Sequence, residues 1–133
     1  MKRDLDLEER NKALVLEAFD ALFNRRDFAA AESYWSPGYI QHSAAIGPGR
    51  DGLLALVRSV HRRHESALAV AEGDYVMIHG RFSGGGRPTR IVVDILRVKE
   101  GRIVEHWDVM QDEATSAESK SGLPMFGDRF PDA

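Results

Sequence analysis

The sequence contains no cysteine among its 133 residues. Disulfide bonds, thiolate metal ligands and cysteine nucleophiles are therefore excluded. A chain without cysteine also fits a reducing compartment, and we expect this protein in the cytoplasm.

Long apolar runs and an excess of positive charge are missing as well. No stretch approaches the roughly 20 apolar residues that a membrane-spanning helix requires, and acidic residues follow Lys2 and Arg3 at once, unlike in a secretory signal. The 18 basic and 21 acidic residues give a net charge of −3, so the electrostatic signature of a nucleic-acid-binding protein is absent. We expect neither a membrane nor a nucleic acid as a partner.

The composition that is present is typical of one globular domain over residues 1–133. Apolar residues make up 43% of the chain and charged residues 29%, which is ordinary for a soluble protein. A chain of this length can bury a stable core. We place that core at about residues 8–112, followed by a polar tail with glycine and proline at 113–133.

The first half of the chain has the apolar spacing of helices. A first helix is predicted from a capping box at Asp6 and Glu9 to about Asn24. A short second helix is predicted over 28–35, before a Ser-Pro-Gly stop, and a third over 50–64. Between the last two, residues 39–42 read as a short extended segment.

The second half has the pattern of strands. Residues 68–72, 75–82, 90–98 and 102–110 are rich in valine, isoleucine and aromatics, with turn signals between them. Three helices followed by a four-strand meander predict an α+β fold with helices on one face of an antiparallel sheet. Because residues 90–98 are apolar on both faces, we expect the uncovered face to bind a second copy of the chain in a homodimer.

One polar residue interrupts the apolar strand 90–98. A carboxylate at Asp94 is costly there unless it is paired or protonated. Perturbed groups of this kind often mark functional sites. The alternative is a structural aspartate that a tyrosine or the backbone satisfies.

The next strand carries His106 and Asp108, which strand alternation places on one face together. A two-residue turn at 100–101 would set Asp94 opposite Trp107 and direct His106 and Asp108 to the other face. A β-bulge in either strand would bring all three polar groups to one side. The sequence leaves both registers open.

Several segments together resemble a known family. Residues 39–42 with 49–52, residues 93–98 and, most specifically, residues 101–111 resemble SnoaL-like proteins of the nuclear-transport-factor-like superfamily. The resemblance covers about residues 8–126. It implies a cone-shaped, cystatin-like α+β fold, in which a curved antiparallel sheet packs on about three N-terminal helices. It also implies a deep pocket between sheet and helices, and usually dimers.

The resemblance also implies a chemistry. Polyketide cyclases of this family use a pocket aspartate and a histidine as acid–base groups, without a cofactor, for an intramolecular aldol closure. In the similar ketosteroid isomerases, Asp94 would match the protonated oxyanion-hole acid. Their carboxylate base would fall near His42 and their oxyanion-hole tyrosine near Phe19, so this sequence departs from them at both places. The family would direct His106 and Asp108 toward the pocket with Asp94.

These observations predict an acid–base enzyme, of the aldol cyclase or isomerase type, acting on a small carbonyl-containing organic molecule. A neutral histidine, His42 or His106, would abstract a proton alpha to the carbonyl. Protonated Asp94 would donate a hydrogen bond to the enolate oxygen, and Asp108 would stabilise the charged histidine. We expect no cofactor and no metal. The residues expected to contact substrate are Tyr39, His79, Trp107 and Met110.

Two alternatives remain at this stage. In the first, the pocket binds a small ligand without catalysis and its polar groups only orient that ligand. In the second, a metal site is formed by His42, His79, His106 and Asp94, ligand types that suit zinc or iron. The spacing of the metal set matches no known motif.

Overall fold

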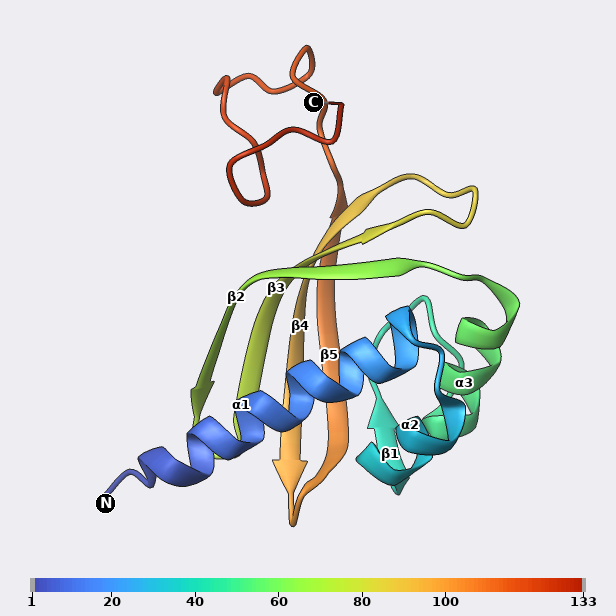
Figure 1. Cartoon of the computed structure of the whole chain (residues 1–133), viewed down its shortest axis with the longest axis vertical. Helices are drawn as coiled ribbons and strands as arrows, with labels where there is room; N and C mark the ends of the chain where they lie inside the picture. The colour runs from blue at the N-terminus through green and yellow to red at the C-terminus, as the bar shows by residue number, and fades with distance from the viewer. Residues whose placement is uncertain (1, 133) are drawn as a thin grey trace.

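The fold is one curved five-stranded sheet with helices on one face, seen in a computed structural model that describes residues 2–132 (Figure 1). The strand order is β1-β5-β4-β3-β2. In chain order the elements are α1 (Leu5–Phe19), the π-helical turn η1 (Asp20–Asn24), α2 (Phe28–Tyr34), β1 (Trp35–Gln41), α3 (Gly49–Ser59), β2 (Arg63–Glu72), β3 (Tyr75–Ser83), β4 (Arg90–Lys99) and β5 (Arg102–Asp112). None of the helices within residues 2–132 is both long enough and apolar enough to span a membrane.

The predicted α+β fold is confirmed, with two differences. The extended segment is longer than predicted and forms β1, which pairs in parallel with β5 and places Gln41 beside His106. The sheet is therefore mixed rather than wholly antiparallel. The third helix ends at Ser59, short of the predicted residue 64, because β2 begins at Arg63 and its backbone pairs with β3.

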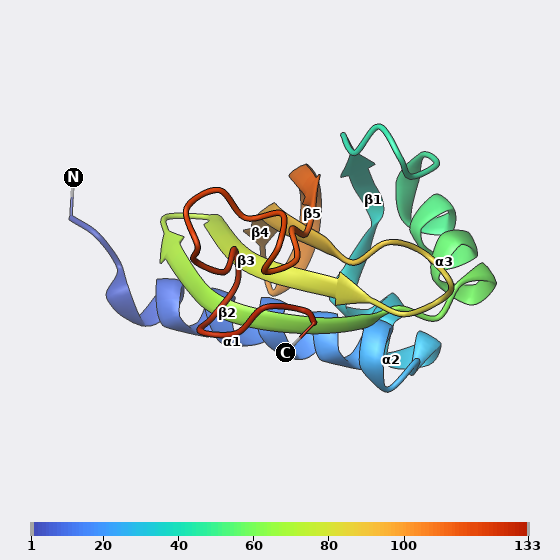
Figure 2. The same ribbon diagram turned by 90° about the horizontal axis from the view of Figure 1, so that it is seen from above.

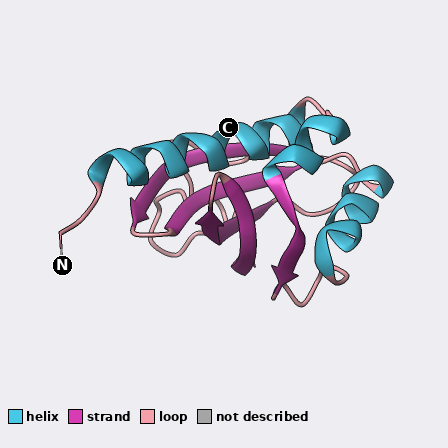
Figure 3. Ribbon diagram, turned by 90° about the horizontal axis from the view of Figure 1, so that it is seen from below, coloured by secondary structure: helices cyan, strands magenta, loops and turns pink. Residues whose placement is uncertain are grey.

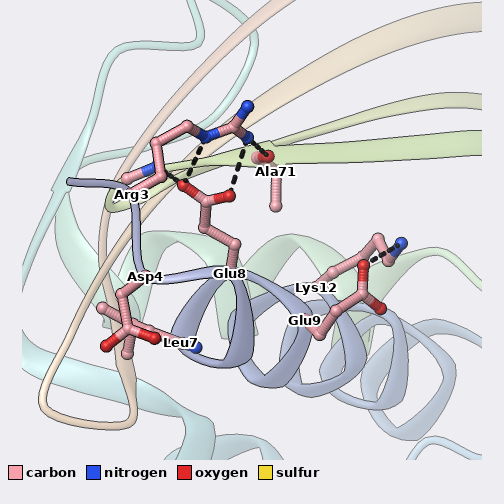
Figure 4. A network of polar contacts seen from close by, with 8 residues as sticks. Arg3, Asp4, Leu7, Glu8, Glu9, Lys12 and Ala71 are labelled. Carbon is pink, nitrogen blue, oxygen red and sulfur yellow. Dashed lines mark hydrogen bonds and ion pairs between the residues drawn. The ribbon is translucent and has the colours of Figure 1, made fainter.

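The start of α1 is fixed by a polar network (Figure 4). Asp4 caps the helix by accepting a hydrogen bond from the Leu7 backbone N–H at 3.0 Å, two residues before the predicted capping box. The buried Glu8 accepts hydrogen bonds from Arg3 at 3.2 and 2.7 Å and from the backbone N–H of Gly73 at 2.8 Å. These contacts attach the first turn of α1 to the β2–β3 turn.

The core lies between α1 and the inner face of the sheet, by which we mean the face that the helices cover (Figure 3). Its fully buried members come from every layer: Val15, Leu22, Trp35, Val76, Ile78, Leu96, Val98 and Ile103. The opposite, outer face leaves large apolar side chains exposed: Leu68, Val70, Tyr75, Met77, Val93 and Val109. Burial therefore distinguishes the two faces of one sheet.

The hairpin between β4 and β5 turns through two residues with positive φ, Glu100 at 50° and Gly101 at 75°. Positive φ at both central residues is the requirement of a type I′ turn, which matches the twist of the flanking strands. Lys99 pairs with Arg102 across this turn. The turn is therefore the predicted two-residue one.

A β-bulge follows directly in β5. Val98 pairs with Ile103, but the next pair joins Arg97 to Glu105, so Val104 is an extra residue on its strand. Beyond the bulge Asp94 lies opposite Asp108 instead of Trp107. Of the two registers that the sequence left open, the structure has the bulged one, and the polar groups of β4 and β5 share the inner face.

The tail after β5 contains neither helix nor strand within residues 113–132 (Figure 2). It contacts the outer face: Glu113 pairs with Arg81 at 2.7 Å. The Phe126 ring lies 5.8 Å from that of His79 and 4.5 Å from the guanidinium carbon of Arg81. These contacts place the tail on the side of the sheet opposite to the helices.

Candidate active site

A cavity of about 140 Å³ lies between the inner face of the sheet and the helices. Much of its wall is apolar and includes Phe19, Phe23, Trp35, Leu53, Val57 and Leu96. The polar residues in its lining that come from β1, β4 and β5 are Tyr39, Arg90, Asp94, His106 and Asp108, and all but Arg90 lie together at one end. Such a site, apolar with few convergent polar groups, is typical of small-molecule binding.

Asp94 and His106 form a buried pair in this cavity. His106 Nε2 lies 2.7 Å from Asp94 Oδ1, and the two side chains are only 6% and 4% exposed. His106 Nδ1 lies 2.6 Å from Gln41 Oε1, which also accepts the Ser43 backbone N–H at 3.0 Å. Since an amide oxygen can only accept, His106 Nδ1 must carry a hydrogen.

With a hydrogen on Nδ1, the short contact between His106 Nε2 and Asp94 Oδ1 holds one further proton. The proton lies either on the carboxyl group, with a neutral imidazole, or on Nε2, with a carboxylate. Burial raises the pKa of Asp94; the hydrogen bond and charge of His106 lower it, and the charge of Asp108 raises it further. We conclude that the Asp94 carboxyl group is a stronger base than an ordinary aspartate.

The second carboxyl oxygen of Asp94 has no partner. Oδ2 is buried and accepts no hydrogen bond from any residue in the range 2–132. Leaving a buried polar atom unsatisfied costs about 1–3 kcal/mol. Because Asp94 lines the cavity, this oxygen is the atom of the pair that remains available to a ligand.

Tyr39 completes the network. Its hydroxyl oxygen accepts a hydrogen bond from Gln41 Nε2 at 2.9 Å, so its own hydrogen is free to be donated. Burial raises the pKa of Tyr39 above the ordinary value of a tyrosine, and the charge of Asp94 raises it further. The phenol therefore stays protonated and can act as a donor in the cavity.

His42, expected at this site, does not reach it. Strand alternation directs Tyr39 and Gln41 inward and leaves His42 on the outer face. There His42 Nε2 lies 2.7 Å from Glu105 Oε2, and its ring stacks on Trp107 with centroids 4.8 Å apart. The expected convergence of four residues is thus wrong for His42 and is found for the other three.

Two of the four residues expected to contact substrate line the cavity, and two do not. Tyr39 and Met110 belong to its lining. Trp107 lies on the outer face between the inward His106 and Asp108, and His79 packs against Phe126 of the tail. Both outward residues alternate with inward ones on their strands, which is the physical reason for their position.

Sequence reasoning missed Gln41, which fixes the hydrogen on His106. The available signal was its alternation with Tyr39, since a polar residue two positions after an inward tyrosine shares its face. The parallel pairing of β1 with β5, which sets Gln41 beside His106, left no comparable mark in the sequence.

Three residues could hold a metal ion. Asp94, His106 and Asp108 each offer one ligand atom, and these atoms lie within 4.8 Å of one another. Because Nδ1 of His106 donates to Gln41, a metal could bind only at Nε2, where it would replace the proton shared with Asp94. The set with His42 and His79 is not assembled, because both lie on the outer face.

Comparison with known proteins identifies the family. The SnoaL-like domain matches residues 15–106, more than half of the sequence. The chain belongs to the SnoaL-like family. The resemblance inferred from the sequence is confirmed. No curated protein matches the chain.

Solved structures of the same fold come from several bacteria. AclR from Streptomyces galilaeus, described as a candidate hydroxylase, is 26% identical with a TM-score of 0.64, over 78% of this chain and 90% of AclR. TsrD from Streptomyces laurentii is 25% identical with a TM-score of 0.66, over 77% and 89% of the two chains. A candidate ketosteroid isomerase from Kribbella flavida, 17% identical with a TM-score of 0.71 over 92% and 96%, shows the shared fold alone.

Proposed function

We propose that this SnoaL-like protein binds a small carbonyl-containing organic molecule in the inner cavity and catalyses acid–base chemistry on it without a cofactor. The reaction would be of the aldol cyclase or isomerase type. The observation that supports this most directly is Asp94, with Oδ1 held by His106 and Oδ2 unpartnered in a largely apolar cavity. Membership of the SnoaL-like family supports a small molecule as the ligand.

The proposed reaction begins with the shared proton on His106 and a carboxylate on Asp94. Asp94 Oδ2 takes the proton from the carbon alpha to the carbonyl, and the C–H electron pair moves to form an enolate. The Tyr39 hydroxyl donates a hydrogen bond to the enolate oxygen. In an isomerase Asp94 returns the proton to another carbon. In a cyclase the enolate carbon attacks a second carbonyl, and Asp94 protonates the resulting alkoxide.

His106 acts in this proposal as a positioning residue. Both of its ring nitrogens are engaged, with Gln41 and with Asp94, so it contacts no substrate. It holds the carboxylate in place and keeps a proton, and Asp108, two residues further along β5, stabilises the imidazolium. This role differs from direct proton abstraction by a histidine, which the sequence suggested.

The test is exchange of deuterium from D2O into the acetyl methyl group of 4-acetylbenzamide, followed by NMR. The protein is expected to accelerate exchange over buffer, and Asp94→Asn to reduce that acceleration by about 10²–10⁴-fold, since it removes the base. Asp128→Asn, on the exposed tail, is the matched control and should leave exchange unchanged. Binding of the ketone without faster exchange would contradict the proposal and indicate a non-catalytic binding protein.

We also propose that the protein is a homodimer that pairs through its outer face. The support is the group of exposed apolar side chains on β2 to β5, which a monomer would leave in water. The tail contacts the outer face at His79 and Arg81. It leaves other apolar side chains of that face in contact with solvent, such as Val109, which is 70% exposed. A second copy of the chain is the simplest way to bury such a surface.

A further inference from the structure

Three arginines line the same cavity as Asp94. Arg62 precedes β2, Arg87 lies in the β3–β4 loop and Arg90 begins β4. Gly85 of that loop lies against Val60 and His61, which follow the end of α3 (Figure 2). Burial lowers the pKa of Arg62, and the charges of Arg90 and Arg87 lower it further. The three arginines therefore place their positive charges around one cavity.

Few negative charges balance this cluster. Arg90 pairs with Asp112 at 3.0 Å. Within the described residues, the Arg62 side chain donates to three backbone carbonyls, those of Phe82, Gly84 and Pro88 at 2.9–3.0 Å, and to no carboxylate. Arg87 makes no hydrogen bond or ion pair with any residue of the described range 2–132. Three cations thus share one carboxylate, in a chain whose net charge is −3.

The cluster lies at a defined distance from the acid–base pair. Arg90, Val92 and Asp94 follow one another along the inner face of β4, and all three line the cavity. Four residues along a strand separate their Cα atoms by about 13 Å, and the arginine side chain shortens the gap. The cavity therefore has a cationic end and an acid–base end, with apolar walls between them that include Phe23 and Phe82.

We propose that the substrate is an anionic carbonyl compound, whose carboxylate or similar anion binds Arg87 and Arg90 while its carbonyl lies at Asp94. Arginine suits this role because its guanidinium matches a carboxylate with two parallel hydrogen bonds. Arg62 holds the β3–β4 loop through its three carbonyl contacts and positions the other two. This inference rests on the proposed function and adds the substrate class.

The test compares the dissociation constants of 4-acetylbenzoate and 4-acetylbenzamide by calorimetry at low ionic strength. The two probes share the ring and the ketone and differ in the charge. The carboxylate is expected to bind about tenfold more tightly. In the double variant Arg87→Gln/Arg90→Gln this preference should fall to within about twofold, while the affinity for the amide stays the same. Arg102→Gln, exposed outside the cavity, removes one positive charge as a control and should keep the preference.

Each outcome separates the inference from the proposed function. Equal affinity for the two probes in the wild type, or a preference that survives in the double variant, overturns the anion site and leaves the acid–base proposal standing. Deuterium exchange into the neutral amide reports on the acid–base proposal by itself. Binding of neither probe overturns both.

Discussion

The two faces of the sheet each carry a pair of histidine and carboxylate side chains at the same distance. His106 and Asp94 lie 2.7 Å apart on the inner face, and His42 and Glu105 lie 2.7 Å apart on the outer face. The inner side chains are 6% and 4% exposed, and the outer ones are 41% and 16% exposed. The distance is equal, and the surroundings differ.

The carboxylates respond to these surroundings in opposite directions. Burial raises the pKa of Asp94. The hydrogen bond from His42, followed by that from Arg97, lowers the pKa of Glu105. Arg97 contacts Oε1 of Glu105 and His42 contacts Oε2, so both oxygens of Glu105 have a partner, whereas Oδ2 of Asp94 has none within residues 2–132. The distance between a histidine and a carboxylate therefore does not distinguish a functional pair from a surface ion pair. Burial of the pair and a polar atom without a partner do distinguish them, and both are found at the inner pair.

The first prediction tests the difference between the two pairs by replacing each histidine in turn. His106→Gln is expected to slow deuterium exchange about 10–100-fold and to shift its pH profile, because Asp94 loses its partner and its proton. His42→Gln should leave both within experimental error. Measuring exchange against pH for the two variants checks this, and equal losses would contradict the distinction between the faces.

The second prediction concerns the sensitivity of the inner face to acid. His64 on the inner face is buried, and its Nε2 has no hydrogen-bond partner among residues 2–132. Burial lowers its pKa to about 4. A ring held neutral by the fold contributes stability that is complete above pH about 6.5 and is lost as the pH falls toward 4. The loss is expected to reach about 3 kcal/mol.

Denaturant unfolding at several pH values tests this prediction. In His64→Gln the free energy of unfolding should decrease less between pH 6.5 and pH 4 than in the wild type. The readout is the slope of this free energy against pH. A loss of stability that is equal at every pH does not change that slope. Leu123→Gln, at a side chain of the tail that is 68% exposed, removes no titrating group and serves as the control that should keep the wild-type slope. A wild-type slope in His64→Gln would show that another group is responsible.

The apolar part of the outer face gives the third prediction. Val109→Glu places a charge in the proposed dimer interface at a side chain that is 70% exposed. Sedimentation velocity is expected to show a dimer for the wild type and a monomer for the variant, with unchanged circular dichroism. A wild type that is monomeric at micromolar concentration would refute self-association through this face.

Much of the fold was readable from local patterns. The runs of valine and isoleucine with turn signals predicted β2 to β5 to within a few residues, apart from the early start of β2 at Arg63. Helical period carried the third helix past its end, because Val60 continues the apolar spacing of Leu53 and Val57, while the backbone pairs with β3 from Arg63 onward. The periodicity of a segment contains no information about the strand with which that segment will pair.

The site was predictable only in part, for the same reason. Asp94 stood out as a carboxylate in an apolar strand, but its meeting with His106 depends on one extra residue, Val104, in β5. A bulge is a property of two paired strands and leaves no clear signature in either. Strand alternation along residues 39–42 separates the inward Tyr39 from the outward His42, so the position of His42 was predictable from the sequence.

The most direct test of the account is a ¹³C NMR titration of the side-chain carboxyl carbons of Asp94 and Glu105 in one sample. We predict that Asp94 titrates above the ordinary range of aspartate and Glu105 below that of glutamate, with Asp94 changing when 4-acetylbenzoate is added and Glu105 unaffected. An Asp94 that titrates in or below the ordinary range, and does not respond to the ligand, would contradict the claim that burial makes the inner pair the acid–base site.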